Sequence, residues 1–436
     1  PFRKRHHSFL MYNKTILENN LAVITHNMSG AYSASIGVWL KVGSRYEDDS
    51  CAGISHFLEH VVFKGSRKYD KDEIKRQIEG RGGMLNGFTS EELTCYLAKV
   101  PHKAAGPVFD ILLDMALNPS LDKEDIHKER TVIIEEIKMY HDLPQHMVHD
   151  LLDKIMWPKH PLGRNIAGSI ESVAAIKRED IAEFQNKYYR PENMVVVFTG
   201  NVKHKECLSL VKGNLSKLKA SQSNYSFNKF SSKQDKAQIE VMEKEIEQTR
   251  LAIGFPAYNR THPKRFVLSL LSIILGGNMS SRLFNEVREK HGLAYEISSQ
   301  AKFLMDTGAF YINAGLDNEK IDLALNLILK ELSKLKDKAV PEQELSRAKE
   351  FSLSHLAMSL EDTLDHMVFL GETFSATGSL MNFDTIKKEV LKVKPKDLKA
   401  VAEDIFRNIK TNISLVGPLG KFKKDGCLSC VNEYLA

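Results

Sequence analysis

An internal duplication limits the fold of this chain more than any other feature of its sequence. The segments Leu121–Ile126 and Val340–Leu345 align without a gap, at an offset of 219 positions (340 − 121). The apolar, strand-like segments Asn193–Gly200 and Asn412–Gly417 follow at the same offset. A run of matching pairs in register is much harder to attribute to chance than a single pair. We therefore interpret the chain as two homologous halves.

Each half reads as strands, a helix, further strands, two or three helices and a closing strand. Thr94–Val100 and Gly308–Ala314, for example, both alternate like strands and are followed by an amphipathic helix. Strands follow one another as often as they alternate with helices, which predicts an α+β fold with a largely antiparallel sheet in each half. The predicted domains are residues 1–211 and 237–436, joined by a Ser-, Asn- and Lys-rich linker at 212–236.

Composition excludes several classes of protein. The chain is 42% hydrophobic and 27% charged, close to the globular average, and it can build sizeable cores. Its net charge of +5 comes from 61 basic and 56 acidic side chains, a balance too even for a protein that coats nucleic acid. The Lys-rich linker has few aromatic residues to stack on bases, so it predicts no nucleic-acid partner. The longest apolar stretches, such as Phe266–Gly276, are far shorter than the roughly 20 residues of a membrane span.

The five cysteines do not follow the pattern of a disulfide framework. Cys51, Cys95 and Cys207 lie far apart in the sequence, which indicates reduced thiols in a reducing compartment. Cys427 and Cys430 form one C-x-x-C pair. Neither the second pair of a zinc ribbon nor the βαβ context of a thioredoxin-like motif accompanies them, so we expect no special role for this pair.

The N-terminal segment Pro1–Leu10 is basic and lacks the apolar stretch of a secretory signal. The chain does not begin with methionine, and Met11 is a candidate natural start. Together with the reduced cysteines, this segment predicts a protein of the bacterial cytoplasm. The mitochondrial matrix is the alternative, if a transit peptide was removed.

The segment Gly53–His60 contains the sharpest functional signal of the chain, the pattern H-x-x-E-H. His56 and His60 are four residues apart, so on a helix both imidazoles leave the same face and can share a Zn²⁺ ion. Glu59 stands next to the second histidine and can accept a proton from a metal-bound water without being a ligand. The alternative is an accidental pattern, in which the histidines cap or pack a helix.

A catalytic zinc needs a third protein ligand, and a later segment, Glu129–Ile137, offers three carboxylates. Glu129 and Glu136 are two helical turns apart and share a face, whereas Glu135 lies about 100° away from Glu136. Carboxylates among valine and isoleucine side chains are costly to bury unless they are paired or bound to a metal. The simpler alternative is a solvated acidic helix edge.

Taken together, these residues resemble the inverzincin metallopeptidases of the pitrilysin/mitochondrial processing peptidase family. The likeness covers nearly the whole chain and is that of a short, bacterial-type member similar to the β subunit of the processing peptidase. Besides H-x-x-E-H and the Glu that follows His60 by 76 positions (136 − 60), it rests on several segments in the family's order. These are the first strand Asn19–Val23, the signature helix Gly53–Ser66, the edge strand Gly82–Tyr96 and His160–Gly168.

The resemblance implies roles for five residues of the first half. His56, His60 and Glu136 would bind one Zn²⁺ per chain, and Glu59 would be the general base. Glu129 would orient a ligand or the catalytic water. The expected fold is a pair of homologous α/β-roll halves, each a mostly antiparallel sheet packed with helices, that close like a clamshell around a chamber.

The resemblance also implies residues that hold the substrate. An extended peptide would add to the strand edge at Asn86 and Gly87. Arg288 and Tyr295 would hold the peptide from the second half and stabilise the oxyanion, although without the resemblance they indicate only a surface charge and a core aromatic residue. The second half lacks H-x-x-E-H, and His355 stands at the position equivalent to Glu136, so one active site per chain is expected.

The chain departs from the family pattern at two places. Gly87 follows Asn86 where the family usually has alanine, which predicts a looser contact with substrate. The processing branch uses two acidic residues beyond the zinc-binding glutamate to recognise a basic presequence residue. Here Asp150 keeps one of them and His146 replaces the other, which argues against strict presequence specificity.

The leading hypothesis is therefore a zinc endopeptidase that hydrolyses unstructured peptides or presequence-like segments inside a closed chamber, with a metal-bound water activated by Glu59. The alternative is a non-catalytic structural subunit of the same fold, like the core subunits of respiratory complexes. The length of the chain matches family members that pair with a second chain. We expect a homodimer, with a heterodimer containing an inactive homologue as the alternative.

Overall fold

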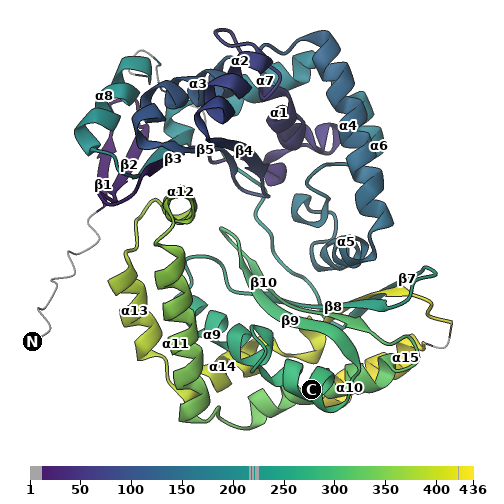
Figure 1. The fold of residues 1–436 in the computed structure, drawn as a ribbon. Helices are drawn as coiled ribbons and strands as arrows, with labels where there is room; N and C mark the ends of the chain where they lie inside the picture. The colour runs from purple at the N-terminus through teal and green to yellow at the C-terminus, as the bar shows by residue number, and fades with distance from the viewer. Residues whose placement is uncertain (1–11, 216–217, 219, 221–224, 421) are drawn as a thin grey trace, which may run out of the picture. The chain divides into compact units, whose positions relative to one another are not determined.

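The computed structural model describes residues 12–215, 218, 220, 225–420 and 422–436 (Figure 1). The chain divides into two compact units, and each unit takes segments from both halves of the sequence. The first unit comprises Pro1–Glu135, Ile166–Phe227 and Leu356–Ile386. The second unit comprises Glu136–Asn165, Asn228–His355 and Lys387–Ala436.

The first unit is built on a six-stranded sheet with the order β1-β2-β6-β3-β5-β4. All neighbouring strands are antiparallel except β2 and β6, which are parallel. Apolar side chains alternate or run continuously along the central strands, so β6 and most of β3 are fully buried. The strands are β1 (Asn13–Ile16), β2 (Ala22–Asn27), β3 (Ser33–Leu40), β4 (Met84–Thr89), β5 (Thr94–Pro101) and β6 (Met194–Gly200).

The second unit is built on a five-stranded sheet with the order β7-β11-β8-β10-β9. Here β7 and β11 are the parallel pair, and the other neighbours are antiparallel. The second sheet therefore repeats the pairing pattern of the first without a counterpart of β1. Its strands are β7 (Gln238–Glu243), β8 (Thr249–Ala257), β9 (Ala294–Phe303), β10 (Gly308–Leu316) and β11 (Asn412–Gly417).

The helices follow the same order in both halves of the sequence (Figure 1). Those of the first half are α1 (Ile54–Val62), α2 (Lys71–Ile78), α3 (Ala105–Leu117), α4 (Lys123–Asp142), α5 (Pro144–Met156), α6 (Ile170–Ala175), α7 (Arg178–Tyr188) and α8 (His204–Leu215). Those of the second half are α9 (Arg265–Gly276), the π-helical segment η7 (Phe284–Lys290), α10 (Ile321–Asp337), α11 (Glu342–Ser359), α12 (Thr363–Thr377), α13 (Phe383–Lys392), α14 (Pro395–Ile405) and α15 (Lys424–Leu435).

The predicted duplication and the predicted fold class are confirmed. Lys123 and Glu342 begin α4 and α11, and they are 219 positions apart (342 − 123). Pro144 and Thr363 begin α5 and α12 at the same spacing. The expected number of helices was too low, because five helices, not two or three, separate β5 from β6 and β10 from β11. A helix as short as the six-residue α6 shows too little periodicity to be recognised in a sequence.

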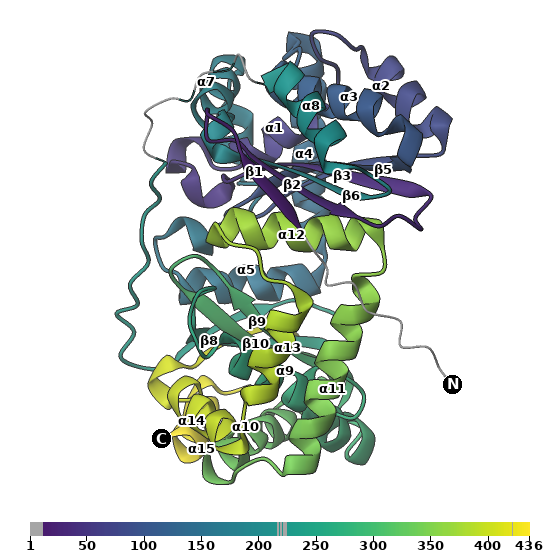
Figure 2. The same ribbon diagram turned by 90° about the vertical axis from the view of Figure 1, so that its left-hand side faces the viewer.

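Each sheet is covered on one face by a helix from the other half of the sequence. In the first unit, α12 crosses β3 and β6 (Figure 2), and its Met367 accepts a hydrogen bond from the Trp39 indole at 3.4 Å. In the second unit, α5 packs on β8 and β11, and Ser414 donates a hydrogen bond to the carbonyl oxygen of Val148 at 2.7 Å. In both units, buried apolar side chains of this helix from the other half of the sequence complete the hydrophobic core.

Three predictions concern the linker, the N-terminal segment and the limits of the domains. Helix α8 continues to Leu215, so the predicted linker at 212–236 begins with helical residues. Linker residues 216–217, 219 and 221–224, and the N-terminal residues 1–11, lie outside the described residues. The predicted domains 1–211 and 237–436 follow the sequence repeat, whereas the compact units exchange segments across those limits.

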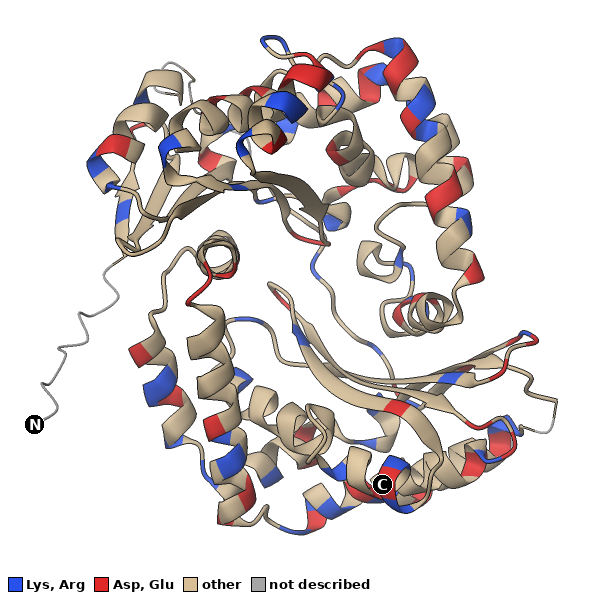
Figure 3. Cartoon of the chain, viewed as in Figure 1, with Lys and Arg blue, Asp and Glu red and all other residues tan. Residues whose placement is uncertain are grey.

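Charged side chains of both signs are interspersed along α4 and α11 (Figure 3). Such mixed faces are typical of helices that contact solvent. Within the described parts of the chain, no helix is both long enough and apolar enough to cross a bilayer.

Candidate metal centre

Helix α1 carries the H-x-x-E-H motif and is fixed at its first turn. Its N-cap residue Gly53 has a positive φ of 95°, a conformation that glycine adopts without strain. The buried carboxylate of Glu47 accepts the backbone N–H groups of Gly53 and Ser55, both at 2.8 Å. A carboxylate at this end of a helix satisfies free N–H groups and complements the positive end of the helix dipole. The start of α1 is therefore held at a defined place.

The sequence of α1 separates an apolar face from a polar one. Ile54, Phe57, Leu58, Val61 and Val62 are buried, whereas His56, Glu59 and His60 are partly exposed. The apolar residues recur at the spacing of one helical face and anchor α1 in the core. The three polar side chains consequently leave the opposite face together.

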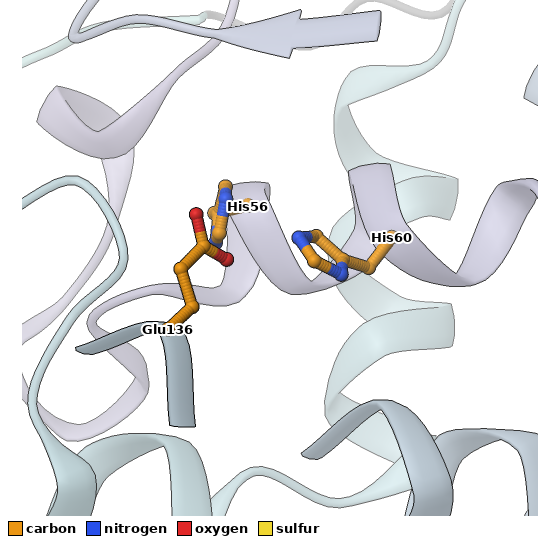
Figure 4. A group of neighbouring side chains, drawn as sticks. All are labelled: His56, His60 and Glu136. Carbon is orange, nitrogen blue, oxygen red and sulfur yellow. The ribbon is translucent and has the colours of Figure 1, made fainter. Parts of the chain in front are cut away.

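His56, His60 and Glu136 come together in the structure. One ligand atom from each lies within 4.8 Å of the other two, and the two imidazole centroids are 4.6 Å apart. Figure 4 shows the carboxylate of Glu136 directed toward the two imidazoles. The border between the two compact units falls between Glu135 and Glu136, inside the continuous helix α4. Glu136 therefore lies on the same helix as Glu129.

The chemistry of these three side chains fits a zinc ion. Two neutral imidazole nitrogens and one carboxylate are a ligand set of catalytic zinc sites, where the fourth position stays open for water or substrate. This is the only group of three or more His, Cys, Asp or Glu residues with metal-binding geometry within the described ranges. Glu135 is not part of it, as the predicted 100° separation on α4 requires.

Glu129 is buried and contacts His60, the second histidine of the motif. Its carboxylate accepts a hydrogen bond from Nδ1 of His60 at 3.2 Å and pairs with Nζ of Lys64 at 2.6 Å. Burial by itself would raise the pKa of Glu129, but the hydrogen bonds from His60 and Lys64 outweigh it and hold that pKa below its usual value. An ionised Glu129 keeps the proton of His60 on Nδ1, which leaves the lone pair of the ring on Nε2.

Glu59 is held from the sheet. The hydroxyl of Thr89, the last residue of β4, donates a hydrogen bond to Oε2 of Glu59 at 2.7 Å. A Cβ atom at Gly87 would lie 3.3 Å from Cγ of Glu59 and 3.1 Å from the ring of Phe63. Both distances are tighter than ordinary contacts, so glycine lets β4 lie close to α1.

Strand β4 is the last strand of the first sheet, next to β5. Asn86 is exposed on it, and its side-chain oxygen accepts the backbone N–H of Gly87 at 2.9 Å. An edge strand beside a candidate metal centre can accept an extended peptide through backbone hydrogen bonds. Asn86 and Gly87 are thus on an edge strand, as the sequence predicts.

Glu136 has a tyrosine one turn further along α4. Burial and a hydrogen bond with the Glu136 carboxylate raise the pKa of Tyr140 above its ordinary value. The ring of His146, on α5, lies 4.7 Å from the ring of Tyr140. Asp150 is hydrogen-bonded by the side-chain amide of Asn165 at 3.2 Å, and burial raises its pKa. His146 and Asp150 therefore both contact side chains of the second unit, to which they belong.

Arg288 and Tyr295 are brought together in the second unit, on η7 and β9. The guanidinium of Arg288 lies 5.5 Å from the centre of the Tyr295 ring and 4.6 Å from that of Phe284. Tyr295 is 71% exposed, so its interpretation as a core aromatic residue was wrong. It sits at the start of β9, where the alternation of the strand turns its ring away from the sheet core. His355, on α11, is exposed.

Sequence reasoning missed three residues that hold the helix or the side chains around this centre. Glu47 caps α1, Lys64 pairs with Glu129, and Thr89 donates to Glu59. Lys64 is four residues after His60, so helical spacing would have put it on the same face. Glu47 precedes α1 by a few residues but stands in no recognisable capping pattern, and the contact of Thr89 depends on tertiary packing.

Comparison with known proteins places the chain in a family. The profile described as "Insulinase (Peptidase family M16)" matches residues 22–169, which contain the candidate metal centre. The profile described as "Peptidase M16 inactive domain" matches residues 175–351, which contain Arg288 and Tyr295. The two profiles together span most of the chain.

Relatives and solved structures agree with these matches. An uncharacterized zinc protease of Streptomyces coelicolor is 33% identical over 95% of this chain and 92% of its own length. An uncharacterized zinc protease of Bacillus subtilis, YmxG, is 32% identical over 94% of this chain and 99% of its own length. The structure of a protease from Helicobacter pylori superposes with a TM-score of 0.90 at 24% identity, over 94% of this chain and 100% of that one, and shows the same fold. The chain therefore belongs to the M16 family of peptidases.

Proposed function

We propose that the protein is a zinc-dependent endopeptidase that hydrolyses unstructured peptides, including presequence-like segments, inside a closed chamber. The observation that carries this proposal is the gathering of His56, His60 and Glu136 within 4.8 Å of one another. The carboxylate of Glu59 leaves the same helical face as the two histidines. The zinc protease names of the bacterial relatives support the same reaction class.

His56, His60 and Glu136 would hold the metal. Zinc bound there supplies a Lewis acid for the scissile carbonyl and lowers the pKa of a coordinated water to about 7. Glu59 would accept a proton from the attacking water and pass it to the leaving amine, as a general base and then a general acid. Glu129 would hold His60 in the tautomer that binds through Nε2.

The substrate would be held from two sides. An extended peptide would add to the edge strand at Asn86 and Gly87, with the backbone of β4 as its partner. Arg288 and Tyr295 would hold the peptide and stabilise the oxyanion that forms on its carbonyl. Strand addition needs an unpaired, extended backbone, so this mode of binding would favour unstructured peptides.

One observation keeps a second candidate function in view. The profile that matches residues 175–351 describes an inactive domain, and that half has no H-x-x-E-H. The alternative is a non-catalytic core subunit of a larger assembly. The complete set of His56, His60, Glu136 and Glu59 favours the peptidase, because a scaffold needs none of them. We propose a homodimer as the assembly and the bacterial cytoplasm as its compartment.

The test combines zinc binding and hydrolysis. Zinc-loaded wild type is expected to cleave an unstructured basic peptide, and a chelator is expected to abolish that cleavage. Glu59→Gln should bind one zinc per chain and cleave nothing, because the ligands remain and the base is gone. Cleavage products identified by mass spectrometry would give the cleaved bonds.

The neighbouring carboxylates of α4 provide a matched control. Glu136→Gln should lose zinc, whereas Glu135→Gln, one residue away and outside the ligand group, should keep both zinc and activity. Equal cleavage by Glu59→Gln and wild type would refute the mechanism. A wild type that binds zinc and cleaves nothing, as monomer or dimer, would favour the core-subunit alternative.

A further inference from the structure

We propose that Thr89 is a positioning residue for the carboxylate of Glu59, an inference that rests on the proposed function. Its hydroxyl lies 2.7 Å from Oε2 of Glu59 and is the donor of that hydrogen bond. Hydrogen bonds from a hydroxyl to an ionised carboxylate are short and strong, so this contact selects one rotamer of a flexible side chain. The carboxylate then points in one direction relative to the imidazoles of α1.

The hydroxyl can do this because the hairpin that carries it is fixed. Thr89 pairs with Thr94 at the end of the β4–β5 ladder. In the turn between them, the backbone N–H of Ser90 donates to the carbonyl of Leu93 at 2.8 Å, and the Ser90 hydroxyl closes the turn with two further hydrogen bonds. The position of Thr89 is therefore set by the hairpin and not by its own rotamer alone.

A single connecting segment holds this turn from outside. The backbone N–H groups of Ser44 and Arg45 donate to the carbonyls of Ser90 and Glu91, at 3.2 and 2.9 Å. The Arg45 guanidinium also pairs with the buried carboxylate of Glu92 at 2.7 Å. Residues 44–45 are thus attached to the hairpin turn by two backbone hydrogen bonds and one side-chain ion pair.

The same segment reaches α1. Two residues after Arg45, the carboxylate of Glu47 accepts the N–H groups of Gly53 and Ser55 at the start of that helix. Residues 44–47 thus tie the hairpin turn and the N-terminus of α1 to one piece of backbone. The distance between Thr89 and Glu59 is consequently set by these backbone contacts, and the hydrogen bond joins the two side chains across that distance.

Pre-positioning of this kind matters for proton transfer. A general base displaced by about 1 Å can lose as much as a hundredfold in rate. The Thr89 side chain contacts the base, whereas a peptide added to β4 would use backbone groups of that strand. Loss of the hydroxyl should therefore lower kcat and leave KM nearly unchanged.

The experiment compares Thr89→Val and Thr89→Ser with wild type. Thr89→Val keeps the shape of the side chain and removes the donor, and it should lower kcat about tenfold with KM and zinc content unchanged. Thr89→Ser keeps the hydroxyl and should restore most of the lost rate.

Thr94 supplies a matched control on the paired strand. Its hydroxyl also donates a hydrogen bond, to the carbonyl oxygen of Val42 at 2.9 Å, and does not contact Glu59. Thr94→Val should lower the Tm without lowering kcat. A readout without activity is the Tm of the metal-free protein, in which the effects of Thr89→Val and Glu59→Gln should be non-additive.

The outcomes separate this inference from the proposed function. If Glu59→Gln is inactive and Thr89→Val has the kcat of wild type, Thr89 does not position the base and only this inference fails. The same holds if Thr89→Ser is as slow as Thr89→Val, or if Thr94→Val is equally slow. If Glu59→Gln is fully active, the proposed mechanism fails and this inference fails with it.

Discussion

The carboxylate of Glu129 lies 3.2 Å from Nδ1 of His60. An ionised carboxylate can only accept, so the imidazole donates its Nδ1–H and presents Nε2 on its other side. The contact spans 69 positions of sequence and joins α1 to α4. It makes the basicity and the orientation of one candidate ligand depend on a residue that lies two helical turns from a second candidate ligand, Glu136.

Substitutions of Glu129 should weaken zinc binding without removing a ligand. Glu129→Gln keeps an acceptor for His60 and loses the charge, and we expect about tenfold lower zinc affinity. Glu129→Leu loses both and should bind zinc about a hundredfold more weakly. Competition with a chromophoric chelator measures these affinities. Glu124→Gln, in an exposed pair with Lys128 on the same helix, is the control, and wild-type affinity in Glu129→Leu would contradict the assigned role.

The buried His366 should make the free energy of unfolding depend on pH. Burial and the nearby His26 lower its pKa from 6.5 to about 4. The hydrogen bond from its Nδ1–H to the carbonyl of Leu360 at 2.9 Å raises the pKa, but burial and the His26 ring, stacked at 4.3 Å, outweigh it, so the folded chain holds His366 neutral. Below pH 6.5 the unfolded chain binds the proton first. Stability should therefore decrease as the pH falls from about 6.5 to about 4, by up to about 3 kcal/mol.

Urea unfolding of the metal-free protein across this pH range measures the effect. In His366→Gln, the slope of the unfolding free energy against pH should be smaller by about 1.4 kcal/mol per pH unit. His355→Gln removes an exposed histidine of α11 and should keep the wild-type slope. Identical slopes in all three proteins would show that His366 titrates alike in the folded and unfolded chains.

Two glycines in helices should respond in opposite ways to alanine. Gly371 is buried in α12, and a Cβ there would come within 2.1 Å of the Trp39 indole. Gly371→Ala should lower the free energy of unfolding by about 1–3 kcal/mol, because the indole is itself buried and packed. At Gly213, in α8, an added Cβ would have no atom within 4 Å. Gly213→Ala should therefore raise the free energy of unfolding by about 0.5–1 kcal/mol. Chemical denaturation distinguishes them, and a stable Gly371→Ala would mean that α12 packs less tightly.

The candidate ligands could be predicted because their signal is local. His56 and His60 are one helical turn apart on α1, and the shared face of Glu129 and Glu136 follows from the period of α4 alone. Which of the two glutamates joins the histidines was a question that periodicity left open. It depends on how α4 lies against α1, and that is decided by packing.

The contacts that surround the ligands could not be predicted in this way. Thr89 reaches Glu59 from a strand 30 positions further along the chain. Glu47 lies only six and eight positions before the N–H groups that it accepts, but neither residue stands in a recognisable pattern. Tyr295 is a large aromatic residue at the start of a strand, where hydrophobicity favours burial, yet it is exposed and stacked with Arg288. Residue type predicts burial only on average, and functional surfaces are among the exceptions.

The fold shows the same division between pattern and packing. The offset of 219 positions correctly predicted equivalent elements in the two halves, down to the first residues of α4 and α11. A repeat indicates which helices are alike and says nothing about the sheet on which each one packs. The placement of α5 on β8 and β11 is therefore absent from the sequence pattern.

Because α5 packs on the sheet of the second unit and α12 on the sheet of the first, both cores depend on an uncut polypeptide. A cut in the segment between α8 and β7 would leave each fragment with a sheet that lacks its covering helix and with a helix that lacks its sheet. Neither fragment would be self-sufficient, and only co-produced fragments could reconstitute both cores.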